Sequence, residues 1–242
     1  MDEYDDIAAS LAWTRTLGLL RTAFKMEANL EKSVNEHIML KFATKNAAKT
    51  VDTMLQNTPE RKPYVNHVPT LTGAIGQKDL FIFYRDYFVS KNPPSLRMKL
   101  VSRTIGVDRV VDEMIISFKH TQEVPWMLPG VPATDRNVQV AVVSIVCLRG
   151  GTLYHEHVYW DQASVLVQIG LLDPKLVPGA MKKRGLKRLP VYGSETASKV
   201  LDVESQPSNG LIPGWQQRPK GDPGALPSTP KQMPNGAGVH SP

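Results

Sequence analysis

Four consecutive runs of strand-forming residues in the centre of the chain restrict the fold more than any other feature. Each run is rich in valine, isoleucine, threonine and aromatic residues, which favour β-strands. Glycine and proline punctuate the segments between them, as at Gly106 and at Gly150 and Gly151. The predicted strands are residues 95–105, 109–122, 137–148 and 152–160. Successive strands with turn segments between them predict a strongly bent antiparallel sheet.

Helical patterns lie on both sides of these strands. Residues 3–57 carry apolar side chains at near-helical spacing and stop before Pro59, which cannot continue a helix. A further helix is predicted over residues 77–89, and a closing helix over 161–171. Helices first, sheet second and one helix last is an α+β order, unlike the alternation of a dinucleotide-binding fold. No glycine-rich phosphate loop is present in the sequence.

The chain divides by composition into three predicted parts. Residues 1–35 are expected to form an N-terminal helical extension, and residues 36–175 the main domain. Residues 176–242 begin with a basic run, Lys182–Arg188, and continue with many Pro, Gly, Ser and Gln residues. Such a segment buries too little apolar surface to offset its chain entropy, so we expect a disordered tail.

Composition narrows the class of protein further. No stretch approaches the roughly 20 apolar residues that a membrane helix needs, and the start of the chain is acidic where a secretory signal would be basic. The one cysteine, Cys147, allows no intramolecular disulfide and no cysteine-rich zinc site. We therefore expect a soluble cytoplasmic protein.

The segment Gly151–Asp173 resembles the end of SnoaL-like domains, the polyketide cyclase or ester cyclase branch of the nuclear-transport-factor-2-like superfamily. The shared features are a last strand running into Trp160-Asp161-Gln162 and a helix with Gln168-Ile169-Gly170. The resemblance covers residues 40–175. Similar domains occur beside dienelactone hydrolase domains, and some carry the name carboxymethylenebutenolidase.

This resemblance implies a cone-shaped barrel, in which a strongly bent antiparallel sheet packs on N-terminal helices around a small-molecule pocket. It also implies a homodimer formed through the sheet. Asp161 matches the carboxylate that such cyclases use as a general acid and base, without a cofactor. An apolar pocket would raise its pKa toward neutrality. Asp161 can equally be the N-cap of the helix that starts there.

His155 and His157 leave the last strand on one face, together with Tyr159. If that face is concave, the imidazoles could bind a substrate carbonyl and stabilise an enolate, with Tyr159 binding substrate. Alternatively, the His-x-His pair with Asp161 resembles the metal-binding motif of cupins. The early helices and the closing helix do not suit a jelly roll, so we expect no metal.

Five more residues complete the predicted site. His67 precedes Pro69 in a loop, where it is a candidate catalytic residue at the pocket rim or an ordinary satisfied histidine. Glu113 has apolar neighbours on its own strand face, and a basic neighbour such as Arg103 would be its ordinary partner. The proline-rich loop around Trp126 is apolar enough to cover the pocket or a twin subunit. The predicted substrate-binding residues are Tyr64, Glu113, His120, Trp126 and Tyr159.

Besides the alternative of a cupin-like metal-binding site at the His-x-His strand, three functions remain open at this level. The first is an enzyme, a cyclase, isomerase or lactone hydrolase, that performs general acid–base chemistry on a polyketide- or lactone-like carbonyl compound. The second is a non-catalytic domain that binds a ligand or a protein. The third is nucleic-acid binding, which the pI of 9.3 suggests. Ten of the 29 Lys and Arg residues follow Leu172, however, and no stacking aromatics interrupt the basic run, so nucleic acid is the least expected partner.

Overall fold

The computed structural model describes residues 5–26 and 28–215. The chain divides into two compact units, Met1–Gln206 and Pro207–Pro242. The second unit is described over residues 207–215, which form turns and bends. All the helices and strands among the described residues belong to the first unit.

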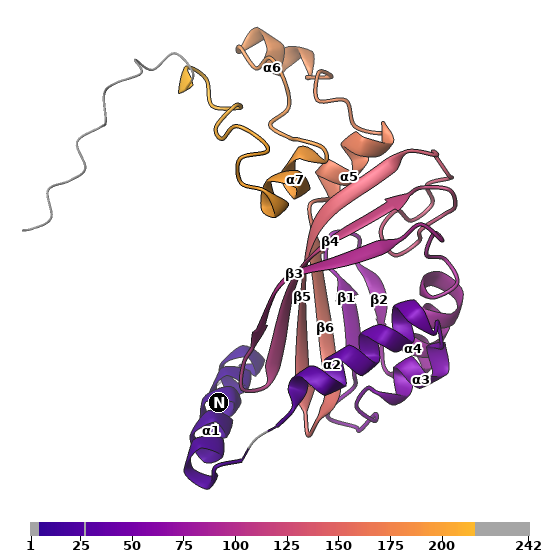
Figure 1. The fold of residues 1–242 in the computed structure, drawn as a ribbon, viewed down its shortest axis with the longest axis vertical. Coiled ribbons are helices and arrows are strands. Elements are labelled where there is room, and N and C mark those ends of the chain that lie inside the picture. The colour runs from indigo at the N-terminus through magenta and orange to yellow at the C-terminus, as the bar shows by residue number, and fades with distance from the viewer. Residues whose placement is uncertain (1–4, 27, 216–242) are drawn as a thin grey trace, which may run out of the picture. The chain divides into compact units, whose positions relative to one another are not determined.

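A six-stranded sheet forms the centre of the first unit (Figure 1). Its strands are β1 (Tyr64–His67), β2 (Thr72–Ile75), β3 (Arg97–Ile105), β4 (Arg109–Lys119), β5 (Asn137–Arg149) and β6 (Thr152–Trp160). Their spatial order is β2-β1-β6-β5-β4-β3, with β2 and β3 at the two edges. Neighbours are antiparallel except β1 and β6, which are parallel. The predicted α+β class and the curved sheet are confirmed, and the sheet is open.

Helices cover one face of this sheet. Figure 1 shows α2 (Leu30–Ile38), α3 (Ala47–Asp52) and α4 (Gln77–Phe83) on the same side of the strands. Two of them continue into π-helical segments, α2 into η1 (Met39–Ala43) and α4 into η2 (Tyr84–Phe88). The remaining helices are α1 (Asp6–Phe24), α5 (Gln162–Ile169), α6 (Gly179–Lys183) and α7 (Glu195–Leu201).

Local sequence signals explain where the covering helices begin and end. Asn29 caps α2 by accepting a hydrogen bond from the Lys32 amide, and α2 then buries Leu30 and Val34 against the sheet. At the other end of the domain, α5 stops at Gly170, whose φ of 82° is the left-handed conformation that glycine supplies at helix ends. These residues set the start of α2 and the end of α5.

The sheet has an inner and an outer face, because side chains alternate along each strand. On β4 the even-numbered residues Val110–Phe118 are buried, and on β6 Glu156, Val158 and Trp160 are buried. The register places Asp112 beside Ser144 and Ser144 beside Val158, so these three side chains lie on one face. That inner face carries the core and, as described below, the cavity.

Helix α1 joins the sheet mainly through polar contacts at the β3–β4 turn. Thr14 Oγ1 donates a hydrogen bond of 2.9 Å to the carboxylate of Asp108, which is 1% exposed. Arg109 and Arg149 also donate to this carboxylate. The predicted extension, residues 1–35, thus spans α1 and most of α2, with residues 1–4 outside the description.

The predicted tail contains two short helices in its described part. Helices α6 and α7 lie within residues 176–215, and Ala197 of α7 is fully buried. Residues 216–242 of the predicted tail lie outside the described residues. Among the helices of the description, none combines the length and apolar character needed to cross a membrane.

Candidate functional site

A cavity of about 240 Å³ lies between the inner face of the sheet and the helices α2, η1 and η2. Most of its wall is apolar. The apolar residues include Ile38, Phe42, Phe88, Met98, Leu100, Met114 and Ile116. The polar residues that line it are Asn35, Lys41, His67, Arg103, Asp112, Ser144 and Glu156. This volume is below the roughly 300–1,000 Å³ typical of drug-sized ligands, which indicates a smaller organic molecule.

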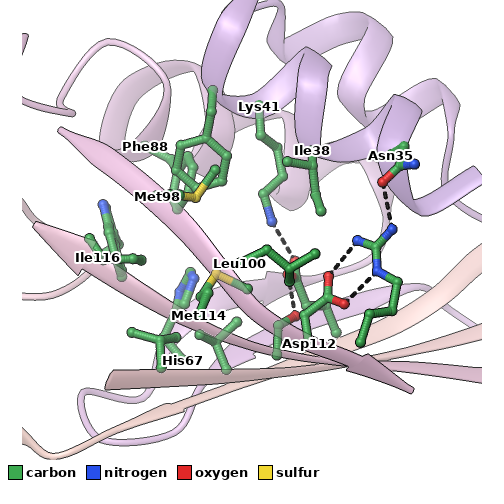
Figure 2. A pocket seen from close by; sticks show the side chains of 17 residues that line it. Asn35, Ile38, Lys41, His67, Phe88, Met98, Leu100, Asp112, Met114 and Ile116 are labelled. Carbon is green, nitrogen blue, oxygen red and sulfur yellow. Dashed lines mark hydrogen bonds and ion pairs between the residues drawn. The ribbon is translucent and has the colours of Figure 1, made fainter. Parts of the chain in front are cut away.

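Lys41 and Glu156 form a buried ion pair in the cavity wall. Figure 2 shows the Lys41 side chain extending into the cavity from its helix. Lys41 Nζ donates to Glu156 Oε2 over 2.6 Å, and Ser144 Oγ donates to Glu156 Oε1 over 3.0 Å. Burial alone would raise the pKa of Glu156, but the positive charge and hydrogen bond of Lys41 outweigh it and hold this pKa at about 2. Glu156 is therefore a carboxylate at neutral pH.

The neutral imidazole of His37 lies next to this pair, with Nε2 3.9 Å from Glu156 Oε2. Thr53 Oγ1 gives its proton to the carbonyl of Thr50, so it accepts from His37 Nδ1 over 2.7 Å. His37 Nε2 is then an acceptor, 3.4 Å from the hydroxyl of Tyr84. Burial, followed by the charge of Lys41, lowers the pKa of His37 to about 3. His37 thus supports the site as an uncharged group.

His67 lies at the end of β1 on the sheet side of the cavity, and Lys41 reaches in from the helical side (Figure 2). Thr72 Oγ1 donates to the carbonyl of Trp126 over 2.8 Å, so it accepts from His67 Nδ1 over 3.2 Å. The Nε2 atom of His67 consequently carries a free lone pair. Burial lowers the pKa of His67 to about 4, so its imidazole is neutral at pH 7.

A second ion pair lines the cavity next to α2. Arg103 Nε and Nη2 donate to the two carboxylate oxygens of Asp112 over 2.6 and 2.7 Å. Arg103 Nη1 also donates to Asn35 Oδ1 over 2.7 Å and to Glu31 Oε1 over 3.1 Å. The sequence suggested Glu113 as the partner of Arg103; that pairing is wrong, and Glu113 accepts from Ser102 instead.

Three irregular segments of the backbone carry side chains that line the cavity. A β-bulge shifts the β3–β4 register between Leu100 and Ser102, which turns Arg103 to the same face as Asp112. The π-helical segment η1 carries Lys41, and η2 carries Phe88. Extra residues of this kind rotate the side chains that follow and are frequent at functional sites.

Two of the predicted imidazoles, those of His155 and His157, lie on the outer face of the sheet, away from the cavity. His155 stacks on Tyr64 with ring centroids 4.8 Å apart and on His157 at 5.0 Å. Tyr159 follows on the same face and is 39% exposed. Burial, then the charges of His157 and nearby arginines, lowers the pKa of His155 to about 4. The structure gathers Tyr64, His155, His157 and Tyr159 in one row but does not join them to the cavity.

Three more predicted residues lie outside the cavity wall. Asp161 is exposed and caps α5, accepting a hydrogen bond of 3.2 Å from the Ser164 amide. Glu113 lies on the outer face of β4. His120 is fully buried, with Nδ1 3.0 Å from Thr134 Oγ1. Asp161 therefore acts as the N-cap of α5 and does not line the cavity.

His67 and Trp126 are the predicted residues that line the cavity. Trp126 is 1% exposed and donates from Nε1 to Asn92 Oδ1 over 2.8 Å. Its neighbours Met127 and Leu128 are also buried, so this loop packs into the core of the same chain. Lys41, Glu156 and the Arg103–Asp112 pair were not predicted.

A signal for the missed residues exists in the sequence. Lys41 interrupts the apolar run around Leu40 and Phe42, and Glu156 shares a strand face with Val158 and Trp160. Isolated charges among apolar residues need a partner when buried. Because Lys41 and Glu156 carry opposite charges, the sequence could have suggested that they pair, although 115 positions separate them.

The described residues offer no group of three or more His, Cys, Asp or Glu side chains arranged to hold a metal ion. The alternative cupin-like site at His155 and His157 therefore has no set of further ligands in residues 5–26 and 28–215. Because the cavity contacts are an ion pair, an imidazole and apolar side chains, the site fits an organic molecule better than a metal.

Fold and site together define an α+β domain with a small, mostly apolar cavity between a curved sheet and its helices. No protein-family model matches the chain, and no curated protein matches it significantly. Solved structures similar to it include TsrD from Streptomyces laurentii, at 18% identity, covering 61% of this chain and 99% of that one with a TM-score of 0.45. A protein described as a SnoaL-like polyketide cyclase from Jannaschia sp. CCS1 has 17% identity, the same coverage and a TM-score of 0.44.

An NTF2-like protein from Burkholderia pseudomallei K96243 is also similar, at 12% identity, covering 59% of this chain and 98% of that one with a TM-score of 0.42. The second and third of these neighbours carry the SnoaL-like and NTF2-like names of the superfamily that the sequence resembles. At such identities and TM-scores they carry nothing about chemistry. The function is therefore argued from the cavity of this chain.

Proposed function

We propose that the protein binds a small, largely apolar carbonyl compound in this cavity and moves a proton at the carbon next to the carbonyl. The observation that carries the proposal is the ammonium group of Lys41, which is 3% exposed and lines the cavity. Among the described residues Glu156 is the one acceptor within hydrogen-bond distance of Lys41 Nζ, so two N–H groups remain for a ligand.

The cavity groups divide the chemistry between them. Lys41 donates to the carbonyl oxygen and stabilises the negative charge that forms there. His67 Nε2 accepts the proton from the neighbouring carbon, whose C–H electron pair becomes the enolate double bond. The proton then returns to another atom of the substrate. A base with a pKa of roughly 4 to 5 can do this when donors hold the enolate oxygen.

Glu156 and the aromatic residues hold Lys41 in position. The ring centroids of Phe88 and Phe42 lie 5.5 and 5.7 Å from Lys41 Nζ. Glu156 remains ionised because its pKa is held at about 2, so it is a positioning residue and a poor base. Such a site suits an isomerisation or a cyclisation of a polyketide- or lactone-like compound.

Exchange of carbon-bound hydrogen in D₂O tests this proposal without knowledge of the product. A panel of cyclic ketones, 1,3-diketones and lactones is incubated with the protein, and loss of the α-proton NMR signals is followed. We expect accelerated exchange for part of the panel. The K41M and H67F variants should lower the rate by about 100-fold, the usual contribution of such groups.

Matched variants separate the cavity from the rest of the molecule. K62M removes an exposed lysine, and H157F removes an imidazole on the outer face. Both should leave exchange unchanged. If H157F abolished exchange and H67F did not, the outer row would be the site and the cavity proposal would be wrong.

A second function, ligand binding without catalysis, is favoured by one observation. Both His67 and Glu156 have lowered pKa values, about 4 and about 2, which makes them weak bases at neutral pH. A compound that raises the melting temperature, is recovered intact and shows no α-proton exchange would support binding alone.

A further inference from the structure

The charged groups of the cavity wall are balanced within the wall itself. Lys41 is paired with Glu156 over 2.6 Å, and Arg103 is paired with Asp112 over 2.6 Å. The side chains of all four are at most 10% exposed. The two histidines beside them, His37 and His67, have pKa values of about 3 and 4 and carry no charge at neutral pH.

We infer that the cavity accepts an uncharged ligand and rejects its carboxylate counterpart. This inference rests on the proposed function and specifies the substrate class. A carboxylate would lose its hydration on entering an apolar cavity and would find no cation without a partner. Near Lys41 it would also stand beside Glu156, and like charges in a low-dielectric site repel strongly.

The hydrogen-bonding capacity of the two cations supports the same reading. Arg103 already donates to Asp112, Asn35 and Glu31 through Nε, Nη1 and Nη2, so little of its guanidinium is left for a ligand. Lys41 still has N–H groups that can donate to one neutral oxygen of a ligand. Its positive charge is balanced by the carboxylate of Glu156. A carbonyl oxygen therefore fits where a carboxylate does not.

A matched pair of probes tests the inference on the unmodified protein. Benzamide and benzoate have nearly the same shape and differ in charge. Binding is followed at pH 7 by the indole NMR signal of Trp126, which lines the cavity. Acetophenone serves as a second neutral probe. We expect the neutral probes to bind at least 100-fold more tightly than benzoate, as for a charge buried without a partner.

Charge variants should weaken the preference for neutral probes. E156Q leaves Lys41 without its carboxylate, and D112N removes the bidentate partner of Arg103 while Glu31 and Asn35 still hold it. Benzoate should bind to these variants more tightly than to the unmodified protein. D86N is the matched control, because Arg85 and Asp86 form an equally short bidentate pair that is 54% and 41% exposed. It should change nothing.

The outcomes distinguish the inference from the proposal beneath it. Benzoate binding to the unmodified protein as tightly as benzamide would overturn the uncharged-ligand inference and leave the cavity as a binding site. If no neutral probe perturbed Trp126, the proposed function itself would fail, and the inference with it. Should E156Q not fold, the D112N variant and the unmodified protein still decide the question.

Discussion

Lys41 has a single carboxylate partner in the described protein, and this pairing sets the energetics of the cavity. Two opposite charges can be buried in a mostly apolar wall because they form an ion pair. Ser144 donates a hydrogen bond to the second carboxylate oxygen of Glu156. Removing one charge leaves the other buried and uncompensated. Removing both leaves no unpaired charge at this position.

A double-mutant comparison tests this reading of the pair. K41M and E156L should each lower the free energy of unfolding by about 3–5 kcal/mol, because each strands a buried charge. The combined K41M/E156L variant should be far closer to the unmodified protein. Urea unfolding followed by circular dichroism measures all three. A double variant as unstable as the sum of the single variants would contradict the pairing.

The buried histidines make stability depend on pH in a predictable direction. The pKa of His67 in the folded protein is lowered from 6.5 to about 4, so in the window between these values the unfolded state binds a proton that the folded state does not. Stability contributed by this group is complete above pH 6.5 and is lost as the pH falls toward 4. The pKa of His37 is lowered to about 3, so this residue also makes the folded state less stable as the pH falls.

Substitution of His67 by a residue that does not titrate isolates this effect. In H67Q the slope of the unfolding free energy against pH should fall by about 1.4 kcal/mol per pH unit between pH 6 and 4.5, the value for one proton. Chemical denaturation at several pH values gives the slope. Equal slopes for H67Q and the unmodified protein would show that His67 titrates normally in the fold.

At the level of elements, irregular segments aim the charged side chains. Lys41 follows the start of the π-helical segment η1, and Arg103 follows the β-bulge of β3. In a regular α-helix, one residue fewer turns the next side chain by about 100°, away from its present direction. The direction of Lys41 toward Glu156 therefore depends on the extra residue.

Deletion of Met39 should convert η1 toward a regular helix and remove Lys41 from its pairing. Met39 is 55% exposed, so its own side chain contributes little to the core. We expect the deletion variant to lose ligand binding. Its stability should fall by about as much as that of the K41M variant. The M39A variant keeps the chain length and should behave normally. Thermal unfolding and the Trp126 NMR signal compare the two, and a deletion variant that still binds ligand would refute the role of the π-helical turn.

Regular elements were predictable from the sequence, because their periodicity is local. The strand predicted over residues 152–160 has those bounds in the structure, and helices 77–89 and 161–171 correspond to α4 with η2 and to α5. Strand β2, which contains Gly73 and ends before Gly76, was not among the predicted strands. Gly73 is required in this strand: with φ of 132°, a side chain there would meet the carbonyl oxygen of Val65 at 2.0 Å.

The site was harder to predict than the fold, for the same physical reason. Which face of a strand is concave depends on the long-range packing of α2 and η1 against the sheet, and no local pattern encodes it. The sequence therefore grouped His155 and His157 correctly on one face but could not place that face outside. The β-bulge before Arg103 and the π-helical segment that carries Lys41 each insert one extra residue, and this insertion changes the direction of the side chain.

Across the whole molecule, the sheet separates two chemically different faces. The inner face holds a cavity with Lys41 and His67, and the outer face holds a row of imidazole and tyrosine rings beginning with Tyr64. Chemistry on a small carbonyl compound needs an enclosed volume that excludes water. The inner face provides a mostly apolar cavity, with a donor and an acceptor in its wall.

The position of a bound ketone tests this account most directly. A crystal structure of the protein with a compound from the exchange panel should show the carbonyl oxygen within about 2.7–3.2 Å of Lys41 Nζ and the neighbouring carbon toward His67 Nε2. A ketone bound on the outer face beside His155 and His157, or lying in the cavity with its carbonyl turned away from Lys41, would contradict it.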